Sequence, residues 1–251
     1  MSRIVVIGGT GLIGSKVVQK LTAHGHEAIA ASPNSGVDTL TGEGLADVLR
    51  GADAVVDVSN SPSFADDDVM HFFTTATTNI AAAAKDAGVG HYIALSVVGA
   101  EKMVDSGYQR AKVAQEQIIR ESGIPFSIVH ATQFFEFAKS IADSATEDGS
   151  VRLSHARIQP IAAEDVATTV AKTAAGEPTG TIVEIAGPEQ FGLDEFVGIG
   201  LAYRDDPRPI IVDADATYFG QRLTDDMLVP GPGATLFDTR FVEWLPANPP
   251  R

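Results

Sequence analysis

The chain has 251 residues, of which 44% are hydrophobic, and its formal net charge at pH 7 is −15. A chain of this length can bury one large core, and its negative charge repels polyanions, which argues against nucleic acid or an anionic membrane as a partner. It has no cysteine, which excludes disulfides and a cysteine nucleophile, and it shows neither a signal peptide nor a membrane span, so we expect a cytoplasmic protein.

Short aliphatic runs alternate with helical patterns along most of the chain. Strands are expected, in chain order, at 4–7, 27–31, 37–40, 54–58, 92–96, 126–129 and 181–185, of which 37–40 is the weakest. Helices are expected over 15–24, 69–87 and 108–122. This alternation is typical of βαβ units and predicts an α/β fold of the Rossmann type, with a doubly wound parallel sheet.

The first expected strand runs directly into a glycine-rich segment over residues 8–14. Its glycines fit the dinucleotide-binding fingerprint, and the strand before it and the helix after it supply the structural context that this fingerprint needs. Missing side chains let the backbone approach a pyrophosphate, and the first N–H groups of the helix point toward it. A glycine-rich turn without a ligand is the alternative. The residues expected to bind the dinucleotide here are Gly8, Thr10, Gly11, Leu12, Ile13 and Gly14.

The second expected strand is followed by Ser32, close to where NAD-preferring proteins place an acidic residue for the ribose 2′-hydroxyl. A 2′-phosphate would meet no repulsion there and could accept hydrogen bonds from Ser32 and its neighbours. We therefore favour NADP(H) as the cofactor. No arginine follows this strand, so NAD(H) stays open as the alternative.

A serine, a tyrosine and a lysine form the candidate catalytic group. Ser96 ends an expected strand, and Tyr108 and Lys112 are four residues apart on the next helix. This spacing places both side chains on one helix face, so Lys112 is expected to lower the pKa of Tyr108 and to hold the nicotinamide ribose. Tyr108 would donate a proton and Ser96 would hold a substrate carbonyl oxygen, while the cofactor supplies hydride. The alternative is a cofactor site without chemistry.

Together these motifs resemble the short-chain dehydrogenase/reductase superfamily, and within it the atypical NmrA-like branch of NAD(P)H-binding proteins. The stretches 79–89, 122–129 and 131–135 support the resemblance. Many members of this branch lack the tyrosine and lysine and act as redox sensors or regulators, whereas this chain keeps both. The resemblance also implies that the nicotinamide end is lined by Ser59, Asn60, Ser61, Gln133 and Phe134.

Beyond residue 187 the helical and strand patterns loosen because prolines interrupt them. We expect one NAD(P)-binding domain over 1–251, in which about 188–251, with part of 133–158, forms a small substrate-side cap. No metal site is expected, because the six histidines show no ligand spacing beyond His24-x-His26. Several aromatic residues could wall an apolar or quinone-like substrate pocket, although such clusters more often form core: Phe72, Phe73, Phe134, Phe135, Phe137, Tyr218 and Phe219.

Two functions are compatible with these patterns. The first is an NAD(P)H-dependent oxidoreductase that reduces a small carbonyl- or quinone-type acceptor by hydride transfer. The second is a non-catalytic NADP(H)-sensing binding protein. In both cases we expect a monomer or homodimer whose ligands are small molecules.

Overall fold

The chain divides into two compact units in a computed structural model that describes residues 1–249. The first unit comprises Met1–Ser96, Gly107–His130 and Val166–Val183. The second comprises Val97–Ser106, Ala131–Asp165 and the chain from Glu184 onward. The expected substrate-side cap reaches residues 250–251, which lie outside the described residues.

A seven-stranded sheet has the order β14-β9-β5-β4-β3-β1-β2. The pairs that β1 forms with β2 and β3, and the pair of β3 with β4, are parallel. Because β2 and β3 lie on opposite sides of β1, the sheet is doubly wound, and β1 ends where open α/β sheets bind their ligands. The predicted Rossmann-type fold is confirmed. The strands are β1 (Arg3–Ile7), β2 (Glu27–Ala31), β3 (Ala54–Asp57), β4 (His91–Val97), β5 (Phe126–Ala131), β9 (Ile182–Ala186) and β14 (Thr235–Leu236).

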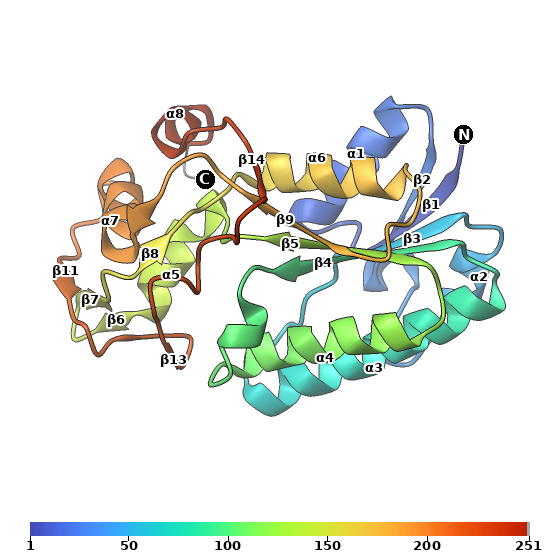
Figure 1. Ribbon diagram of the computed structural model, residues 1–251, viewed down its shortest axis with the longest axis horizontal. Helices are drawn as coiled ribbons and strands as arrows, with labels where there is room; N and C mark the ends of the chain where they lie inside the picture. Colours follow the sequence, from blue (N-terminus) through green and yellow to red (C-terminus); the bar gives the residue numbers. More distant parts are fainter. Residues whose placement is uncertain (250–251) are drawn as a thin grey trace. The chain divides into compact units, whose positions relative to one another are not determined.

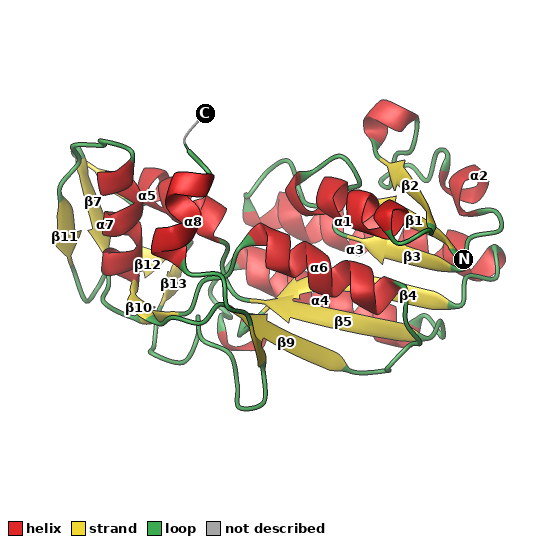
Figure 2. Cartoon of the chain, turned by 90° about the horizontal axis from the view of Figure 1, so that it is seen from above, coloured by secondary structure: helices red, strands yellow, loops and turns green. Residues whose placement is uncertain are grey.

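Helices cover both faces of the sheet in the first unit. Figures 1 and 2 show α1 and α6 on one face and α3 and α4 on the other. Ile4, Val5 and Val6 of β1 are completely buried, as a strand covered on both faces requires. The helices of this unit are α1 (Leu12–Ala23), α2 (Leu45–Leu49), α3 (Asp66–Asp86), α4 (Gly107–Glu121) and α6 (Ala163–Ala174).

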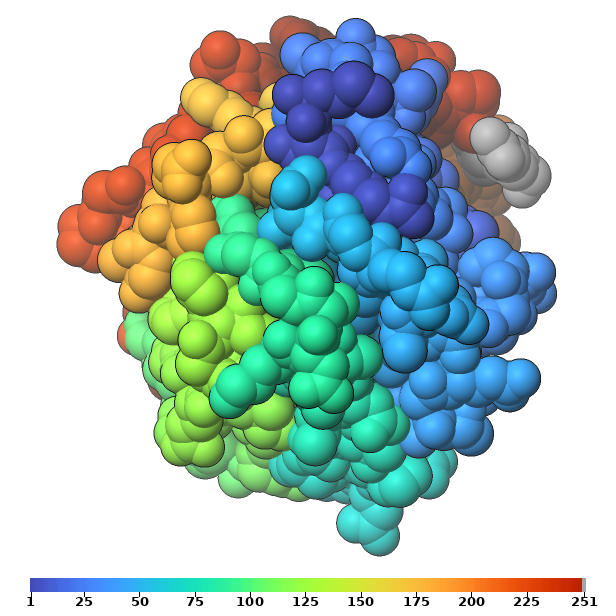
Figure 3. Space-filling view, turned by 90° about the vertical axis from the view of Figure 1, so that its right-hand side faces the viewer, coloured from blue at the N-terminus to red at the C-terminus, as the bar shows by residue number. Residues whose placement is uncertain are grey.

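Local sequence signals set the ends of the two long helices. Three aspartates, 66–68, form the first turn of α3, where carboxylates interact favourably with the helix dipole. Gly88 and Gly123 follow α3 and α4 with φ angles of +73° and +78°, a conformation that ends a helix and favours glycine. In Figure 3 the segments that lead into β1, β3, β4 and β5, coloured from dark blue to yellow-green, follow one another in the order of the sheet.

The expected strand at 37–40 is absent, so that prediction is wrong. Its residues form turns because the Asp38 carboxylate accepts hydrogen bonds from the N–H groups of Leu40 and Thr41, at 2.8 and 3.2 Å. Such local side-chain bonding competes with strand pairing. The chain therefore goes from β2 to α2 and then to β3 without a further strand.

The second unit has an aromatic core and short strands. Phe135, Phe196 and Phe241 are nearly completely buried, and the ring of Phe241 lies 5.0 Å from that of Phe135 and 4.7 Å from that of Phe196. Phe135 is therefore core, not pocket wall. Within residues 1–249 no helix is long and apolar enough to cross a membrane.

The elements of this unit are small. The helices are α5 (Ala138–Ser144), α7 (Leu193–Tyr203) and α8 (Phe241–Ala247). One sheet has the order β11-β7-β6, β8 pairs with β10, and β12 pairs with β13. The strands are β6 (Thr146–Glu147), β7 (Ser150–Leu153), β8 (Arg157–Ile158), β10 (Phe191–Gly192), β11 (Ile210–Val212), β12 (Thr217–Tyr218) and β13 (Gln221–Arg222).

Candidate functional site

Close backbone packing fixes three glycines of the turn between β1 and α1. A Cβ atom on Gly14 would lie 2.1 Å from the carbonyl oxygen of Gly8, and one on Gly9 would lie 2.6 Å from the Cα of Ala30. Gly8 has a φ angle of +78°, and its Cβ would lie 2.9 Å from the Cα of Ser59. These glycines are therefore required by the fold itself, and the turn touches the loop that follows β3.

Gly11 differs from the other glycines of the turn. Its φ angle is −79°, which any residue can adopt, and a Cβ there would meet only the carbonyl oxygen of Gly8, at 3.3 Å. Thr10, Gly11 and Leu12 are exposed, and Leu12 has 42% of its surface accessible. The packing of the turn therefore does not require glycine at position 11. The missing side chain leaves open space in front of the start of α1.

The start of α1 is suited to an anion. The first N–H groups of a helix have no partner within it, and no side chain caps this one. Its first turn has no acidic residue, so the positive end of the helix dipole is not neutralised locally. A pyrophosphate fits this position, with Ile13 and Gly14 buried behind the exposed residues of the turn.

The residue after β2 has an unused hydroxyl group. Ser32 is 6% exposed, and its Oγ has no hydrogen-bond partner among the described residues. The Ser35 hydroxyl donates to the carbonyl oxygen of Ser32 at 2.9 Å and accepts from the Ser32 N–H at 2.9 Å. The Ser32 side chain therefore does not cap its own turn, and its buried hydroxyl at the end of β2 is left without a partner.

A buried carboxylate joins the loop after β3 to the sheet and to α4. Asp57, only 1% exposed, accepts hydrogen bonds from the N–H and hydroxyl of Ser59, at 3.1 and 2.6 Å, on Oδ1. On Oδ2 it accepts from the Tyr92 hydroxyl at 3.1 Å and from Gln115 Nε2 at 2.9 Å. Because buried charge is costly unless hydrogen-bonded, these four bonds hold the loop in one place.

Tyr108 lies against this same loop. Its hydroxyl donates to Asn60 Oδ1 at 3.2 Å, and its ring lies 5.8 Å from that of Phe64 and 5.7 Å from that of Phe73. The structure therefore brings Tyr108 together with Asn60, one residue from the Ser59 backbone that contacts Gly8. Ser61, 6% exposed, accepts from the N–H of Ser63 at 3.3 Å and shapes the loop.

The expected lowering of the Tyr108 pKa is not found. Burial raises the pKa of Tyr108 to about 12. The Lys112 ammonium was expected to lower this pKa. It donates instead to the carbonyl oxygen of Leu95 at 2.9 Å and to Gln115 Oε1. It also lies 4.5 Å from the centre of the Phe73 ring. Burial lowers the pKa of Lys112 to about 8, although the carboxylates of Asp57 and Glu116 oppose that change.

Ser96 has a different role from the expected one. Its hydroxyl donates its single proton to Glu116 Oε1 at 2.6 Å, so it cannot also donate to a substrate oxygen in this arrangement. His130 Nε2 lies 2.7 Å from the same oxygen, and Arg120 donates to Glu116 Oε2 at 2.8 Å. Burial alone would raise the pKa of Glu116, but His130, Ser96 and Arg120 outweigh it and hold that pKa below its usual value.

Gln133 and Phe134 follow β5 and belong to the second unit. Gln133 is 6% exposed, and its Oε1 has no hydrogen-bond partner among the described residues. The ring of Phe134 stacks on that of Phe137, with 4.9 Å between the ring centres. Both residues remain predicted cofactor contacts.

The sequence pattern did not reveal that polar side chains are buried on the inner face of α4. Lys112, Gln115 and Glu116 are all buried there. The signal for Asp57 was present, because a charged residue in an aliphatic strand needs buried partners. No pattern in the sequence identified those partners.

Comparisons with known proteins identify the family of this chain. A family model described as NAD(P)H-binding matches residues 8–177. The (4-alkanoyl-5-oxo-2,5-dihydrofuran-3-yl)methyl phosphate reductase of Streptomyces griseus subsp. griseus is 31% identical over 210 residues, which cover 76% of this chain and 70% of that protein.

Solved structures show the same fold. The dTDP-4-dehydrorhamnose reductase of Bacillus anthracis in complex with NADP has a TM-score of 0.72 at 13% identity, covering 96% of this chain and 95% of that one. The NADPH-dependent quinone oxidoreductase of Escherichia coli complexed with NADPH has a TM-score of 0.65 at 20% identity, covering 84% and 77%.

Gly14→Ala should destabilise the protein much more than Gly11→Ala. The new Cβ at residue 14 would meet backbone at 2.1 Å, whereas the one at residue 11 would meet it at 3.3 Å. We expect Gly14→Ala to lower the free energy of unfolding by about 2 kcal/mol, and Gly11→Ala to lower it by less than about 1 kcal/mol. Urea unfolding measures both; equal losses would contradict the packing described here.

Lys112→Met should flatten the pH dependence of stability above pH 8. The native lysine loses its proton near pH 8, whereas the ordinary value is 10.5. The unfolded chain therefore binds more protons in this window, and the free energy of unfolding of the unmodified protein rises with pH. Tyr108 has the opposite effect, but only above about pH 10, where the unfolded chain loses the tyrosine proton that the folded protein keeps. The rise is therefore expected between pH 8 and pH 10.

Urea unfolding at a series of pH values across this window measures the slope. The matched control is Lys172→Met, at an exposed position of α6, which should keep the rise. A slope that survives in Lys112→Met would show that Lys112 is not the group responsible.

Proposed function

This chain belongs to the NAD(P)H-binding family, and we propose that it is an NADPH-dependent reductase that transfers hydride to a small carbonyl- or quinone-type acceptor. One observation carries the proposal: the Tyr108 hydroxyl, a proton donor, binds Asn60 on the loop whose backbone touches the glycine turn. A group that can supply a proton and a turn that can hold a pyrophosphate thus share one edge of the first unit.

The residues present fit a bound dinucleotide. The open space at Gly11 and the first N–H groups of α1 would hold the pyrophosphate. The unpartnered hydroxyl of Ser32 would donate to a 2′-phosphate, which is why we favour NADP(H) over NAD(H). When bound, the nicotinamide supplies the hydride.

Tyr108 is suited to donate a proton during reduction. With a pKa raised to about 12, it keeps its proton at neutral pH and releases it only to an oxygen on which negative charge develops. In this arrangement the single hydroxyl proton is given to Asn60 Oδ1 at 3.2 Å, so the hydroxyl must rotate away from Asn60 to donate to a substrate oxygen. Lys112 holds α4 to the sheet through the carbonyl oxygen of Leu95 in β4, which keeps Tyr108 in place.

The similar proteins support an acceptor of this class. By its name, the Streptomyces griseus relative is a reductase of a phosphate ester that carries alkanoyl and oxo groups. The Escherichia coli protein of similar fold is named a quinone oxidoreductase. A carbonyl or quinone oxygen becomes more negative as hydride arrives, which is the point at which a phenol proton is needed.

The arrangement of Ser96 favours a second candidate, a dinucleotide-sensing protein without turnover. In many reductase mechanisms a second donor polarises the carbonyl, but the Ser96 proton is given to Glu116. A sensor would bind NADP(H) through the same turn and Ser32, and would need no such donor. Turnover separates the two candidates.

Tyr108→Phe should lower kcat about 10²-fold or more with carbonyl or quinone acceptors, because the proton donor is lost. NADPH binding, measured by calorimetric titration, should be unchanged, since the phenol is not needed to hold the pyrophosphate. The matched control is Tyr203→Phe, at an exposed tyrosine of α7, which should keep full activity. Equal rates in Tyr108→Phe and the unmodified protein would remove Tyr108 as the acid.

If no acceptor is reduced while NADPH still raises the melting temperature, the sensor becomes the better assignment.

Ser32→Ala should weaken NADPH binding about tenfold or more and leave NADH binding unchanged. The hydroxyl would donate to the charged 2′-phosphate, which only NADPH carries, and such bonds contribute about 1.5–3 kcal/mol. The melting temperature without cofactor should hardly change, because the hydroxyl has no partner within the described chain. Calorimetric titrations with both cofactors measure the ratio, and an unaltered ratio would remove Ser32 from 2′-phosphate recognition.

A further inference from the structure

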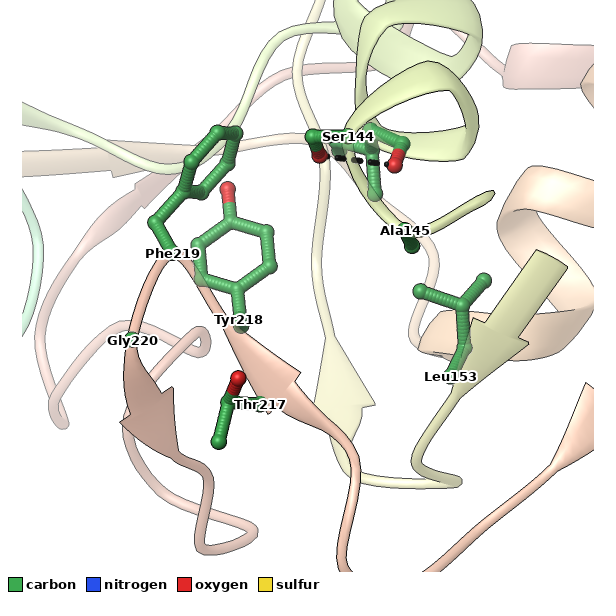
Figure 4. Close-up of a pocket in the computed structure, with 8 residues that line it drawn as sticks. Ser144, Ala145, Leu153, Thr217, Tyr218, Phe219 and Gly220 are labelled. Atoms are coloured by element: carbon green, nitrogen blue, oxygen red, sulfur yellow. Dashed lines mark hydrogen bonds between the residues drawn. The ribbon is translucent and has the colours of Figure 1, made fainter. Parts of the chain in front are cut away.

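A cavity of about 130 Å³ lies within the second unit, between the end of α5 and the β12–β13 hairpin. Figure 4 shows the rings of Tyr218 and Phe219 on one side of this space and Ala145 and Leu153 on the other. Ile141 contributes a further aliphatic side chain, and Thr217 brings a hydroxyl. We call this cavity the hairpin pocket.

The turn of the hairpin has an unusual residue. Phe219 and Gly220 connect the two strands, with φ angles of +46° and +85°. Tight hairpin turns need positive φ at both central residues and strongly favour asparagine or aspartate followed by glycine. A bulky aromatic residue at the first of these positions is strained, at a cost of about 1–3 kcal/mol.

Packing within the protein does little to offset this strain. Phe219 is 47% exposed, and its ring packs edge to face on that of the neighbouring Tyr218, with 4.7 Å between the ring centres. By contrast, Leu153 on the other side of the pocket is only 2% exposed. An aromatic ring held in a strained conformation beside a cavity, and half in solvent, is placed for contact with a ligand.

The size and lining of the pocket select the ligand. An apolar protein cavity of about 150 Å³ holds one benzene molecule, so the hairpin pocket can take a group of similar or slightly smaller size. Aliphatic side chains and Ser144 on one side and two rings on the other favour an aromatic group, which can pack edge to face on the rings. The Thr217 hydroxyl could bond a polar substituent on that ring.

The hairpin also lies beyond the part of the chain that matches the cofactor-binding family. That match ends at residue 177, whereas the turn is at 219–220. A pocket built partly from this hairpin is therefore a feature of this chain's own second unit.

We propose that the hairpin pocket is a binding site of the second unit for a small aromatic group, a single ring that carries one polar substituent.

Phenol is the probe, because it combines a ring with one polar substituent and its binding requires neither cofactor nor turnover. We expect saturable binding to the full-length protein in the millimolar range, followed by NMR chemical-shift changes of residues around the pocket. Glycerol, which has no ring, should cause no saturable change. Absence of saturation with phenol, or shifts confined to residues outside the pocket, would overturn the proposal.

Two variants test the assignment independently. Ala145→Phe fills the pocket and should weaken phenol binding at least tenfold. Phe219→Asn keeps the turn, because asparagine tolerates positive φ, but removes the ring, and should weaken binding severalfold while the melting temperature stays the same or rises. Unchanged phenol affinity in Phe219→Asn would overturn the role of the ring even if Ala145→Phe fails to fold.

Discussion

The close approach of three backbone segments at the end of β1 is the constraint on which the rest of the first unit depends. Gly14 packs against the turn at Gly8, Gly9 packs against β2 at Ala30, and Gly8 packs against the loop after β3 at Ser59. Side chains at these positions would force the segments apart. The same packing brings the start of α1, the end of β2 and the loop after β3 to one edge, where a dinucleotide can contact all three.

A network of buried polar groups then fixes α4 on the sheet. Asp57 connects the loop after β3 to Gln115, and Gln115 accepts from Lys112, so the lysine of the candidate pair is linked to the loop that carries Asn60. One turn further along α4, Glu116 connects the helix to Ser96. Removing one member would leave a buried charge without its partner. Such an unpaired charge destabilises a protein more than replacing the whole pair with apolar residues does. The position of Tyr108 is therefore held by polar contacts as well as by its aromatic neighbours.

The two units differ in composition. The first presents the backbone N–H groups at the start of α1 and the Ser32 hydroxyl, the groups that we propose hold the dinucleotide. The second has a core rich in aromatic residues and a strained hairpin turn at Phe219, beside which lies the pocket that we propose holds an aromatic group.

The amino-acid sequence alone was enough to predict the Rossmann-type sheet, the glycine turn and the helix that carries Tyr108 and Lys112, because strand periodicity, glycine spacing and helix ends are local signals. The prediction failed at 37–40, where the Asp38 side chain accepts hydrogen bonds from nearby N–H groups and replaces strand pairing. The directions of the polar side chains, in contrast, depend on the folded structure. Ser96 turns to Glu116, Lys112 turns to Gln115, and burial raises the pKa of Tyr108 instead of lowering it. Hydrogen-bond partners and burial depend on residues far apart in the chain, and spacing along a helix carries no information about them.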